Sequence, residues 1–143
     1  MVKGIVKQSR QAKVLIAGAA VTATGFALTA PISFWGGVNP QTGLIANIRH
    51  PQFGCSVAGK ILCLPATVGS SSAAAVLLEL VYAKLAPAAI ILHEPDAILL
   101  LGLIVAQEMG LQTPCALQLD HKHYAALDQK SLMISAQGAI SAL

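Results

Sequence analysis

The sequence predicts a single α/β domain built in three layers, β/β/α. Three observations predict it. The 143 residues are the length of one domain. The first half of the chain is rich in strand-like segments, and strand-like and helix-like segments alternate in the second half. Alternation of this kind is typical of right-handed parallel strand–helix–strand units. The remaining strands are then expected to form a second sheet layer.

The composition indicates a folded chain with an unusual surface. Hydrophobic residues make up 55% and charged residues 10%, which excludes a disordered chain. Average proteins carry about 25% charged residues, so part of this surface is expected to contact a membrane or a partner protein. Four of the nine basic residues, Lys3, Lys7, Arg10 and Lys13, gather at the N-terminus. The rest of the chain is nearly neutral, which argues against a nucleic-acid surface.

The chain from Val14 to Ile48 carries no charged side chain, yet it does not fit a membrane span. Its second half is interrupted by Pro31, Gly36, Gly37, Pro40 and Gly43, which would leave backbone groups unpaired in lipid. A signal peptide over the first 30 residues is the open alternative. We expect a cytoplasmic protein, because the segment after Ala17 partly alternates like a strand. Three cysteines also form no even set of disulfides.

The expected elements of the first half are mostly strands. Residues 1–12 are predicted to form a loose basic arm, and residues 13–143 the domain. The β-rich run 14–30 forms two strands or one long strand bent at its glycines. The elements that follow are an irregular loop at 33–43, a short strand at 44–48, a turn at 50–54 and a strand at 57–64.

The second half alternates between helices and strands. The run 73–85 consists of good helix formers, and a second helix begins at Pro95-Asp96 and ends at Gly110. Strands are predicted at 88–92 and 114–119. The tail is expected to hold a short helical turn and a last strand at 132–135.

Gly69-Ser70-Ser71-Ser72 is the strongest local signal for chemistry, because it directly precedes the predicted helix 73–85. The first turn of a helix has unpaired N–H groups and a partial positive charge. Glycine lets a ligand approach the backbone closely. A serine at this position can cap the helix, bind an anion or be held as a reactive alkoxide, and the local sequence leaves these readings open.

Other candidate residues are ambiguous from the sequence alone. Trp35 is either a packed corner or part of a pocket or interface. The pair Arg49-His50 either neutralises a substrate carboxylate or caps a turn. His93 is either a solvated loop residue or functional. The sequence contains no CxxC pair and no GxSxG or phosphate-loop motif. We therefore expect no metal site within this chain, with Cys55, Cys63 and Cys115 as small core residues.

The order of the motifs resembles a known family. The segments PISFWGGVNPQTG, HPQFGCSVAGKILCLP, GSSSAAAVLLEL, LAPAAIIL and GLIVAQEMGLQTP follow one another as in the small, swivelling part of aconitase X, over about residues 14–119. The resemblance implies a swivelling β/β/α domain and a hydro-lyase. It implies a separate small subunit that works with a large catalytic subunit, and burial against that subunit accounts for the low charge.

The same resemblance implies roles for individual residues. An iron centre or iron–sulfur cluster in the large subunit polarises the leaving hydroxyl, and Ser70 is the general base. Gly69, Ser71 and Ser72 help to hold the substrate. We expect further substrate contacts from Gly36, Gly37, Arg49 and His50. Ordinary aconitases carry an arginine where this chain has Ser72, which argues against a tricarboxylate substrate.

Two substrates and two other classes of protein remain to be weighed. The run GSSSAAA is closer to the bacterial branch that dehydrates cis-3-hydroxy-L-proline, and an archaeal phosphomevalonate dehydratase is the alternative. A non-catalytic regulatory or assembly module that binds an anion is the alternative outside enzymes. A phosphohistidine domain needs a histidine just before its aliphatic run, and this chain has Leu99-Leu100-Leu101-Gly102 there, which argues against that class.

Overall fold

The computed structural model describes residues 9–143. The longer helices are α2 (Ala73–Tyr82) and α3 (Ala97–Glu108). Three short elements complete the helical part: α1 (Phe34–Gly37), η1 (His121–His123) and α4 (Tyr124–Leu127). Trp35 and Gly36 have non-helical dihedral angles, so α1 is part of an irregular loop, as predicted. The strands are β1 (Ser9–Gln11), β2 (Lys13–Ile16), β3 (Val21–Ala27), β4 (Ile61–Leu64), β5 (Ala89–Leu92), β6 (Cys115–Gln118), β7 (Ser131–Ile134) and β8 (Ala139–Ala142).

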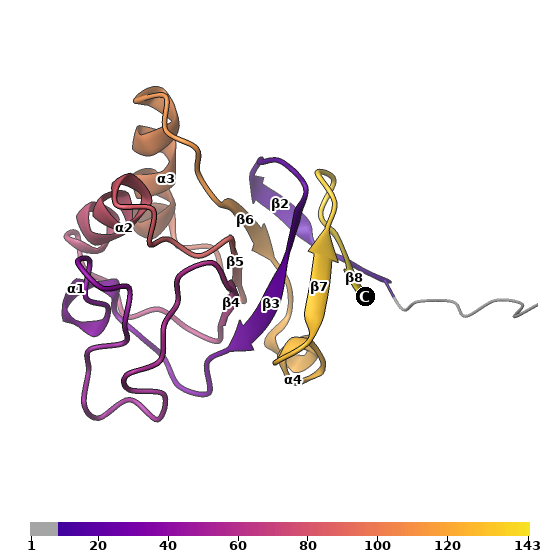
Figure 1. The fold of residues 1–143 in the computed structure, drawn as a ribbon, viewed down its shortest axis with the longest axis horizontal. Helices are drawn as coiled ribbons and strands as arrows, with labels where there is room; N and C mark the ends of the chain where they lie inside the picture. Colours follow the sequence, from indigo (N-terminus) through magenta and orange to yellow (C-terminus); the bar gives the residue numbers. More distant parts are fainter. Residues whose placement is uncertain (1–8) are drawn as a thin grey trace, which may run out of the picture.

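The strands are ordered β1-β8-β7-β3-β4-β5-β6-β2. Strands β3 to β6 run parallel, and the remaining pairs are antiparallel. Helices α2 and α3 cover one face of the parallel strands, and β7 and β8 lie on the other side (Figure 1). Each space between layers is filled by its own cluster of buried apolar side chains. The predicted β/β/α architecture is thus confirmed.

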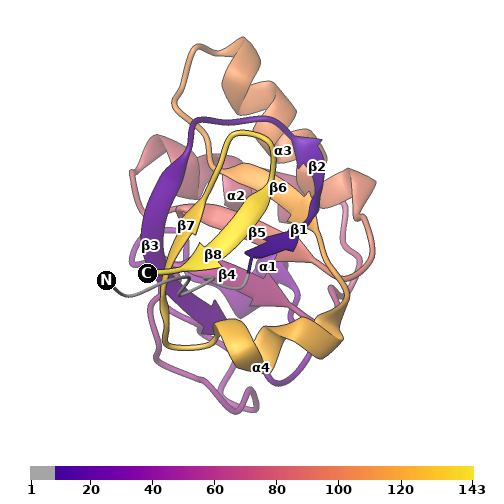
Figure 2. The same cartoon turned by 90° about the vertical axis from the view of Figure 1, so that its right-hand side faces the viewer.

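A single stretch of chain joins the two ends of the sheet. Strands β1 and β2 stand at opposite ends of the strand order although only Ala12 separates them. The Ala12 N–H donates to the carbonyl of Gly138 at 3.0 Å. Gly138 has a φ of +88°, and an added Cβ there would lie 2.8 Å from the Ala12 oxygen. Figure 2 shows β1 beside β8 and its continuation into β2.

The predicted loose arm over residues 1–12 is therefore wrong at its end, because Ser9–Gln11 pair with β8. Residues 1–8 of that arm lie outside the described residues.

The two main helices form as their sequences predict. The Asp96 carboxylate caps α3 by accepting the N–H of Leu99 at 3.0 Å, and Gly110 follows the helix with a φ of +78°. The helices also pack closely. A Cβ added at Gly102 would lie 2.6 Å from the carbonyl oxygen of Ala74, so only glycine permits this approach of α3 to α2.

Three strand predictions need correction. The segment 44–48 makes only isolated bridges, Leu44 with Ser56 and Ile45 with Val38, because tight turns on both sides prevent a ladder. Only 61–64 of the predicted strand 57–64 is a strand, since Gly59 turns the chain with a φ of +69°. Strand β8, which has four residues and follows the turn at Gly138, was not predicted. Within residues 9–143, no helix combines the length and the apolar character needed to cross a bilayer.

Candidate functional site

The carboxyl ends of the parallel strands carry the candidate site. The loop 65–72 leaves β4 at this edge, and the loop 93–96 leaves β5 beside it. Ligands of open α/β sheets commonly bind at this edge, where strand ends and helix beginnings converge. A cleft of about 630 Å³ opens between the two loops. The residues of these two loops that line it are Pro65, Ala66, Thr67, Gly69, His93, Glu94, Pro95 and Asp96.

Ser70 is held at the beginning of α2 by its own side chain. Its Oγ accepts the backbone N–H of Ser72 at 3.2 Å, and its carbonyl accepts the N–H of Ala73 at 3.1 Å. The Ser72 hydroxyl makes no capping hydrogen bond. The half-buried Ser70 oxygen therefore receives an N–H from the positive end of the helix, an arrangement that stabilises negative charge on Oγ.

The neighbours of Ser70 leave the approach to it open. Gly69 and Ser71 are exposed, and no atom lies within 4 Å of a Cβ placed on Gly69. The Ser72 N–H is engaged by Ser70, so in this arrangement it is not free for a substrate carboxylate. The predicted binding role of Ser72 thus requires its hydroxyl or a shift of the loop.

The structure brings the glycine loop after β3 alongside the Ser70 loop. The N–H of Val68 donates to the carbonyl of Ile32 at 3.0 Å, and the N–H of Ile32 donates to Ala66 at 3.3 Å. Gly36 is exposed and Gly37 is buried. Trp35 is 61% exposed, so it is not a packed corner. With Gly36 it lines a cavity of about 440 Å³ against Ala75, Val76 and Glu79 of α2.

Arg49 and His50 differ sharply in their surroundings. Arg49 is exposed. His50 is buried, with Nδ1 accepting the N–H of Gln52 at 3.0 Å and Nε2 at 3.2 Å from the carbonyl oxygen of Ala30. Because Nδ1 accepts, Nε2 carries the proton and donates. Both ring nitrogens thus support the loop, and the structure gives neither residue a hydrogen bond to 69–72 within the described part of the chain.

His93, Asp120 and His121 gather where β5 and β6 end, with one potential ligand atom of each within 4.8 Å of the others. The Nδ1 of His93 accepts the backbone N–H of His121 at 3.1 Å, which places the ring proton on Nε2. Neither nitrogen of His93 then offers a free lone pair, so the cluster does not fit a metal ion. The Lys122 N–H, which donates to Asp120 at 2.9 Å, lowers the pKa of that carboxyl below its ordinary value.

The three cysteines are unpaired and lie in two kinds of environment. Cys63 and Cys115 are buried, as predicted, and desolvation raises the pKa of Cys63 to about 12. Cys55 is exposed, which differs from the predicted core position. It lies beside Lys60 at a shallow cavity.

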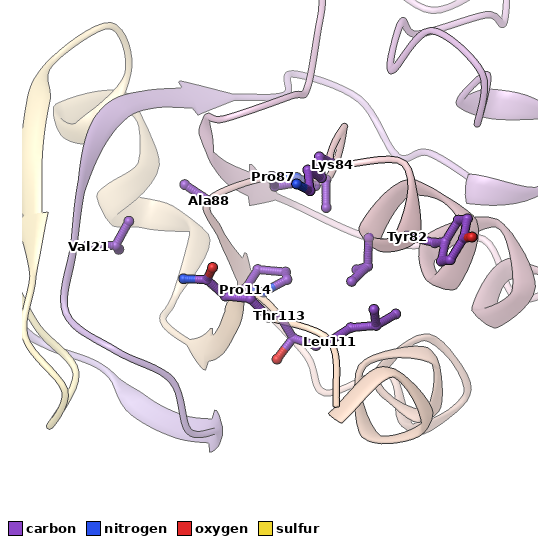
Figure 3. A pocket seen from close by; sticks show the side chains of 11 residues that line it. Val21, Tyr82, Lys84, Pro87, Ala88, Leu111, Thr113 and Pro114 are labelled. Carbon is purple, nitrogen blue, oxygen red and sulfur yellow. The ribbon is translucent and has the colours of Figure 1, made fainter. Parts of the chain in front are cut away.

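A further cavity, of about 490 Å³, lies at the opposite edge of the parallel strands (Figure 3). It is lined by segments that lead into β5 and β6, among them Pro87, Ala88, Thr113 and Pro114. None of the predicted site residues lines it. We therefore place the candidate site at the carboxyl edge, which holds Gly69.

Thr67, His93 and Asp96 share the cleft with Gly69. Thr67 and Asp96 are not among the predicted site residues, and the sequence leaves His93 open between a solvated loop residue and a functional one. The Thr67 hydroxyl donates to Asp96 Oδ2 at 2.7 Å across the cleft. The sequence signal that could have identified these residues is their position along the chain. Each of these residues follows the carboxyl end of a predicted strand, and parallel strands bring such residues to one edge.

Comparison with known proteins links this fold to one family. The model of the aconitase X swivel domain matches residues 9–141. A cis-3-hydroxy-L-proline dehydratase of Pseudomonas aeruginosa is 45% identical over 107 residues, which are 73% of this chain and 18% of that protein. A phosphomevalonate dehydratase small subunit of Methanothermobacter thermautotrophicus is 40% identical over 78 residues, 54% of this chain and 60% of that subunit. The chain thus spans less than two thirds of the length of these relatives.

A solved structure agrees with the sequence comparison. The crystal structure of Thermococcus kodakaraensis aconitase X in its holo form superposes with a TM-score of 0.81 at 25% identity. The alignment covers 95% of this chain and 98% of that one.

Proposed function

This chain belongs to the aconitase X swivel domain family, and we propose that it acts as the small subunit of an aconitase X-type hydro-lyase. In this proposal the chain contributes Ser70 to an active site that a large catalytic subunit completes. The observation that carries it is the Ser70 Oγ, which accepts an N–H at the start of α2, directly after Gly69, which lines an open cleft. The family match and the names of the relatives support the reaction class.

The proposed reaction removes water from a hydroxy acid. An iron centre or iron–sulfur cluster in the large subunit, when bound, supplies the Lewis acid for the leaving hydroxyl. Ser70, as its alkoxide, takes the proton from the neighbouring carbon. The electron pair of the broken C–H bond forms the C=C bond, and the hydroxyl leaves with the C–O pair. The Ser72 N–H and the helix terminus stabilise the charge that Ser70 carries before proton transfer.

The described cleft supports the need for a partner. Its lining in residues 9–143 contains no lysine or arginine, and His93 is its only basic side chain. A substrate carboxylate needs a cationic or hydrogen-bonding partner when it leaves water. We infer that the large subunit provides such groups when it closes over this edge, and that closure excludes the water that would quench an alkoxide.

We propose cis-3-hydroxy-L-proline as the substrate. The match to the dehydratase of that name is longer and closer than the match to the phosphomevalonate subunit, 45% over 107 residues against 40% over 78. The uncharged Ser72 also suits a small acid. Phosphomevalonate is the second candidate, because the relative with that name is a small subunit of which 60% is matched. The three unpaired cysteines suit the reducing cytoplasm, where we place the complex.

The decisive experiment uses Ser70→Ala in the complex with the large subunit, assayed on both acids. We expect turnover to fall by about three orders of magnitude or more, because the base is removed. Size-exclusion chromatography should show an unchanged complex. Ser131→Ala, at an exposed serine of β7, is the control and should retain most of the activity. Near-normal turnover of the Ser70→Ala complex would favour the non-catalytic regulatory or assembly module.

A further inference from the structure

Helix α3 is apolar on its outer side as well as on its inner side. Its inner residues, Leu99, Leu100, Leu103 and Ala106, are buried against the rest of the domain. The outer side of α3 and the residue that follows it expose a line of large apolar residues that we call the α3 stripe: Ile98, Leu101, Ile104, Val105 and Met109. Spacings of three and four residues place most of these side chains on one face. With a rise of about 1.5 Å per residue the stripe is roughly 16 Å long.

The stripe is unusual for a surface that faces only water. Leu101 is 51% exposed and Met109 is 56% exposed. The only charged residue of α3 is Glu108, at its end. A surface helix normally carries polar side chains on its outer face, and a helix that is apolar all round is normally covered. Exposed apolar residues gathered in this way mark an interaction surface.

The helix that carries the stripe is held in place by close packing against α2 and by a cap at its beginning. Gly102 lies on the inner side of α3, and its contact with the Ala74 backbone brings the two helices together more closely than any larger residue would allow. Asp96 fixes the beginning of α3 through the N–H of Leu99. A partner that binds the stripe therefore meets a preformed surface, so little conformational entropy is lost on binding.

The stripe is continuous with the candidate site. Ile98, its first residue, lines the same cleft as Gly69. Val68, next to Gly69, is also exposed. Exposed apolar residues thus lie on the loop that carries Ser70, at the cleft and along α3. A protein that closes the cleft in order to complete the Ser70 site has this surface directly in front of it.

We propose that the α3 stripe is the docking surface for the large catalytic subunit. The identity of the partner rests on the proposed function. The segment that matches this chain is only 18% of the length of the Pseudomonas aeruginosa relative, so in that protein most of the chain lies outside it and is available to cover such a face. The low charge of this chain has the same explanation, because interface centres are depleted of charged residues.

The test uses Leu101→Glu and Val105→Glu in the full chain, with the dissociation constant of the complex measured by titration calorimetry. We expect each substitution to raise the dissociation constant at least tenfold, because it buries an unpaired carboxylate in the interface. Met133→Glu is the matched control. Met133 is 43% exposed on β7, on the far side of the sheet from α3 (Figure 1), and its substitution should leave the constant unchanged. Circular dichroism and thermal unfolding of each variant check that the fold is intact.

Several results would overturn the docking proposal. One is binding of the folded Leu101→Glu and Val105→Glu chains with the affinity of the parent chain. Another is a homodimer of the parent chain that these substitutions abolish while the complex with the large subunit stays unchanged, because the stripe would then hold a second copy. The proposed function is tested separately. An inactive Ser70→Ala complex together with normal assembly of Leu101→Glu would refute only the docking surface. An active Ser70→Ala complex together with weakened assembly of Leu101→Glu would refute only the role of Ser70.

Discussion

The hydroxyl of Thr67 donates a 2.7 Å hydrogen bond to Oδ2 of Asp96, and this bond joins the loop that carries Ser70 to the beginning of α3. The other carboxylate oxygen of Asp96 accepts the N–H of Leu99. One carboxylate therefore fixes a helix and, across the cleft, the loop after β4. The position of Ser70 relative to α3 depends on this pair.

Replacing Thr67 by valine should loosen the Ser70 loop without a change in side-chain size. We expect a loss of about 1 kcal/mol in the free energy of unfolding, the usual scale for one hydrogen bond. Turnover of the complex should fall several-fold, because the base is less well positioned. Urea unfolding and steady-state kinetics measure the two effects. Thr22→Val, at an exposed position on β3, is the control. Equal behaviour of the two variants would show that the Thr67–Asp96 bond does not position the loop.

The N–H of Ser72 can be tested separately from its hydroxyl. Ser72→Pro removes the donor to Ser70 Oγ, whereas Ser72→Ala keeps it and removes only a hydroxyl that caps nothing. A hydrogen bond to a charged oxygen contributes about 1.5–3 kcal/mol, so Ser72→Pro should lower kcat by at least tenfold. The kcat of the Ser72→Ala complex should remain within a few-fold of the parent value, and a substrate contact made by the hydroxyl would show as a higher KM. Thermal unfolding of both chains controls for damage to α2. A folded, fully active proline variant would contradict this role of the backbone.

Alanine substitutions at two glycines should differ in their effect on the free energy of unfolding. Gly102→Ala places a methyl group 2.6 Å from the Ala74 carbonyl oxygen and should destabilise the fold by about 1–3 kcal/mol, because α2 and α3 must separate. A methyl group at Gly69 meets no atom within 4 Å, so Gly69→Ala should leave the stability nearly unchanged. Chemical denaturation of both variants makes the comparison. Equal losses would mean that the contact between the helices is not tight.

The buried thiol of Cys63 predicts a loss of stability at alkaline pH. Burial raises the pKa of Cys63 from 9.0 to about 12, and the Asp128 carboxylate adds to the shift. The unfolded chain therefore releases this proton from about pH 9, whereas the folded chain keeps it until about pH 12. The free energy of unfolding should fall as the pH rises across this interval. Denaturation curves measured from pH 8 to pH 11 test the slope.

The control for this prediction is Cys63→Ala. Its overall stability should be lower, because it leaves a small cavity, but its stability should depend less steeply on alkaline pH. Tyr124 contributes in the same direction, since burial also raises the pKa of its phenol, so some slope should remain. Parallel curves for the parent and the variant would contradict the assignment to Cys63.

The sequence predicted those elements that carry strong local signals. Helix α3 is bounded by a capping aspartate at 96 and by Gly110, and both act in the structure as their chemistry requires. Strands β5 and β6 are short and apolar on both faces, which is typical of parallel strands between two layers. The GSSS run was singled out for its place before a helix, and the structure puts it there.

The elements that sequence reasoning missed depend on distant partners. The segment 44–48 is apolar enough for a strand, but no neighbouring strand is positioned to pair with it beyond single bridges. Strand β8 is a strand because β1 and β7 lie on either side of it. The cleft arises in the same way. Thr67 and Asp96 are separated by 29 positions along the chain, and no local pattern indicates that they bond.

The run of residues 9–16 pairs with β8 at one end and with β6 at the other, so it holds the two ends of the strand order together. The two β layers therefore cannot separate unless the hydrogen bonds of this run are broken first. In the proposed complex, a movement that opens or closes the candidate site would then carry residues 9–143 as one unit, with its pivot in the contacts with the large subunit.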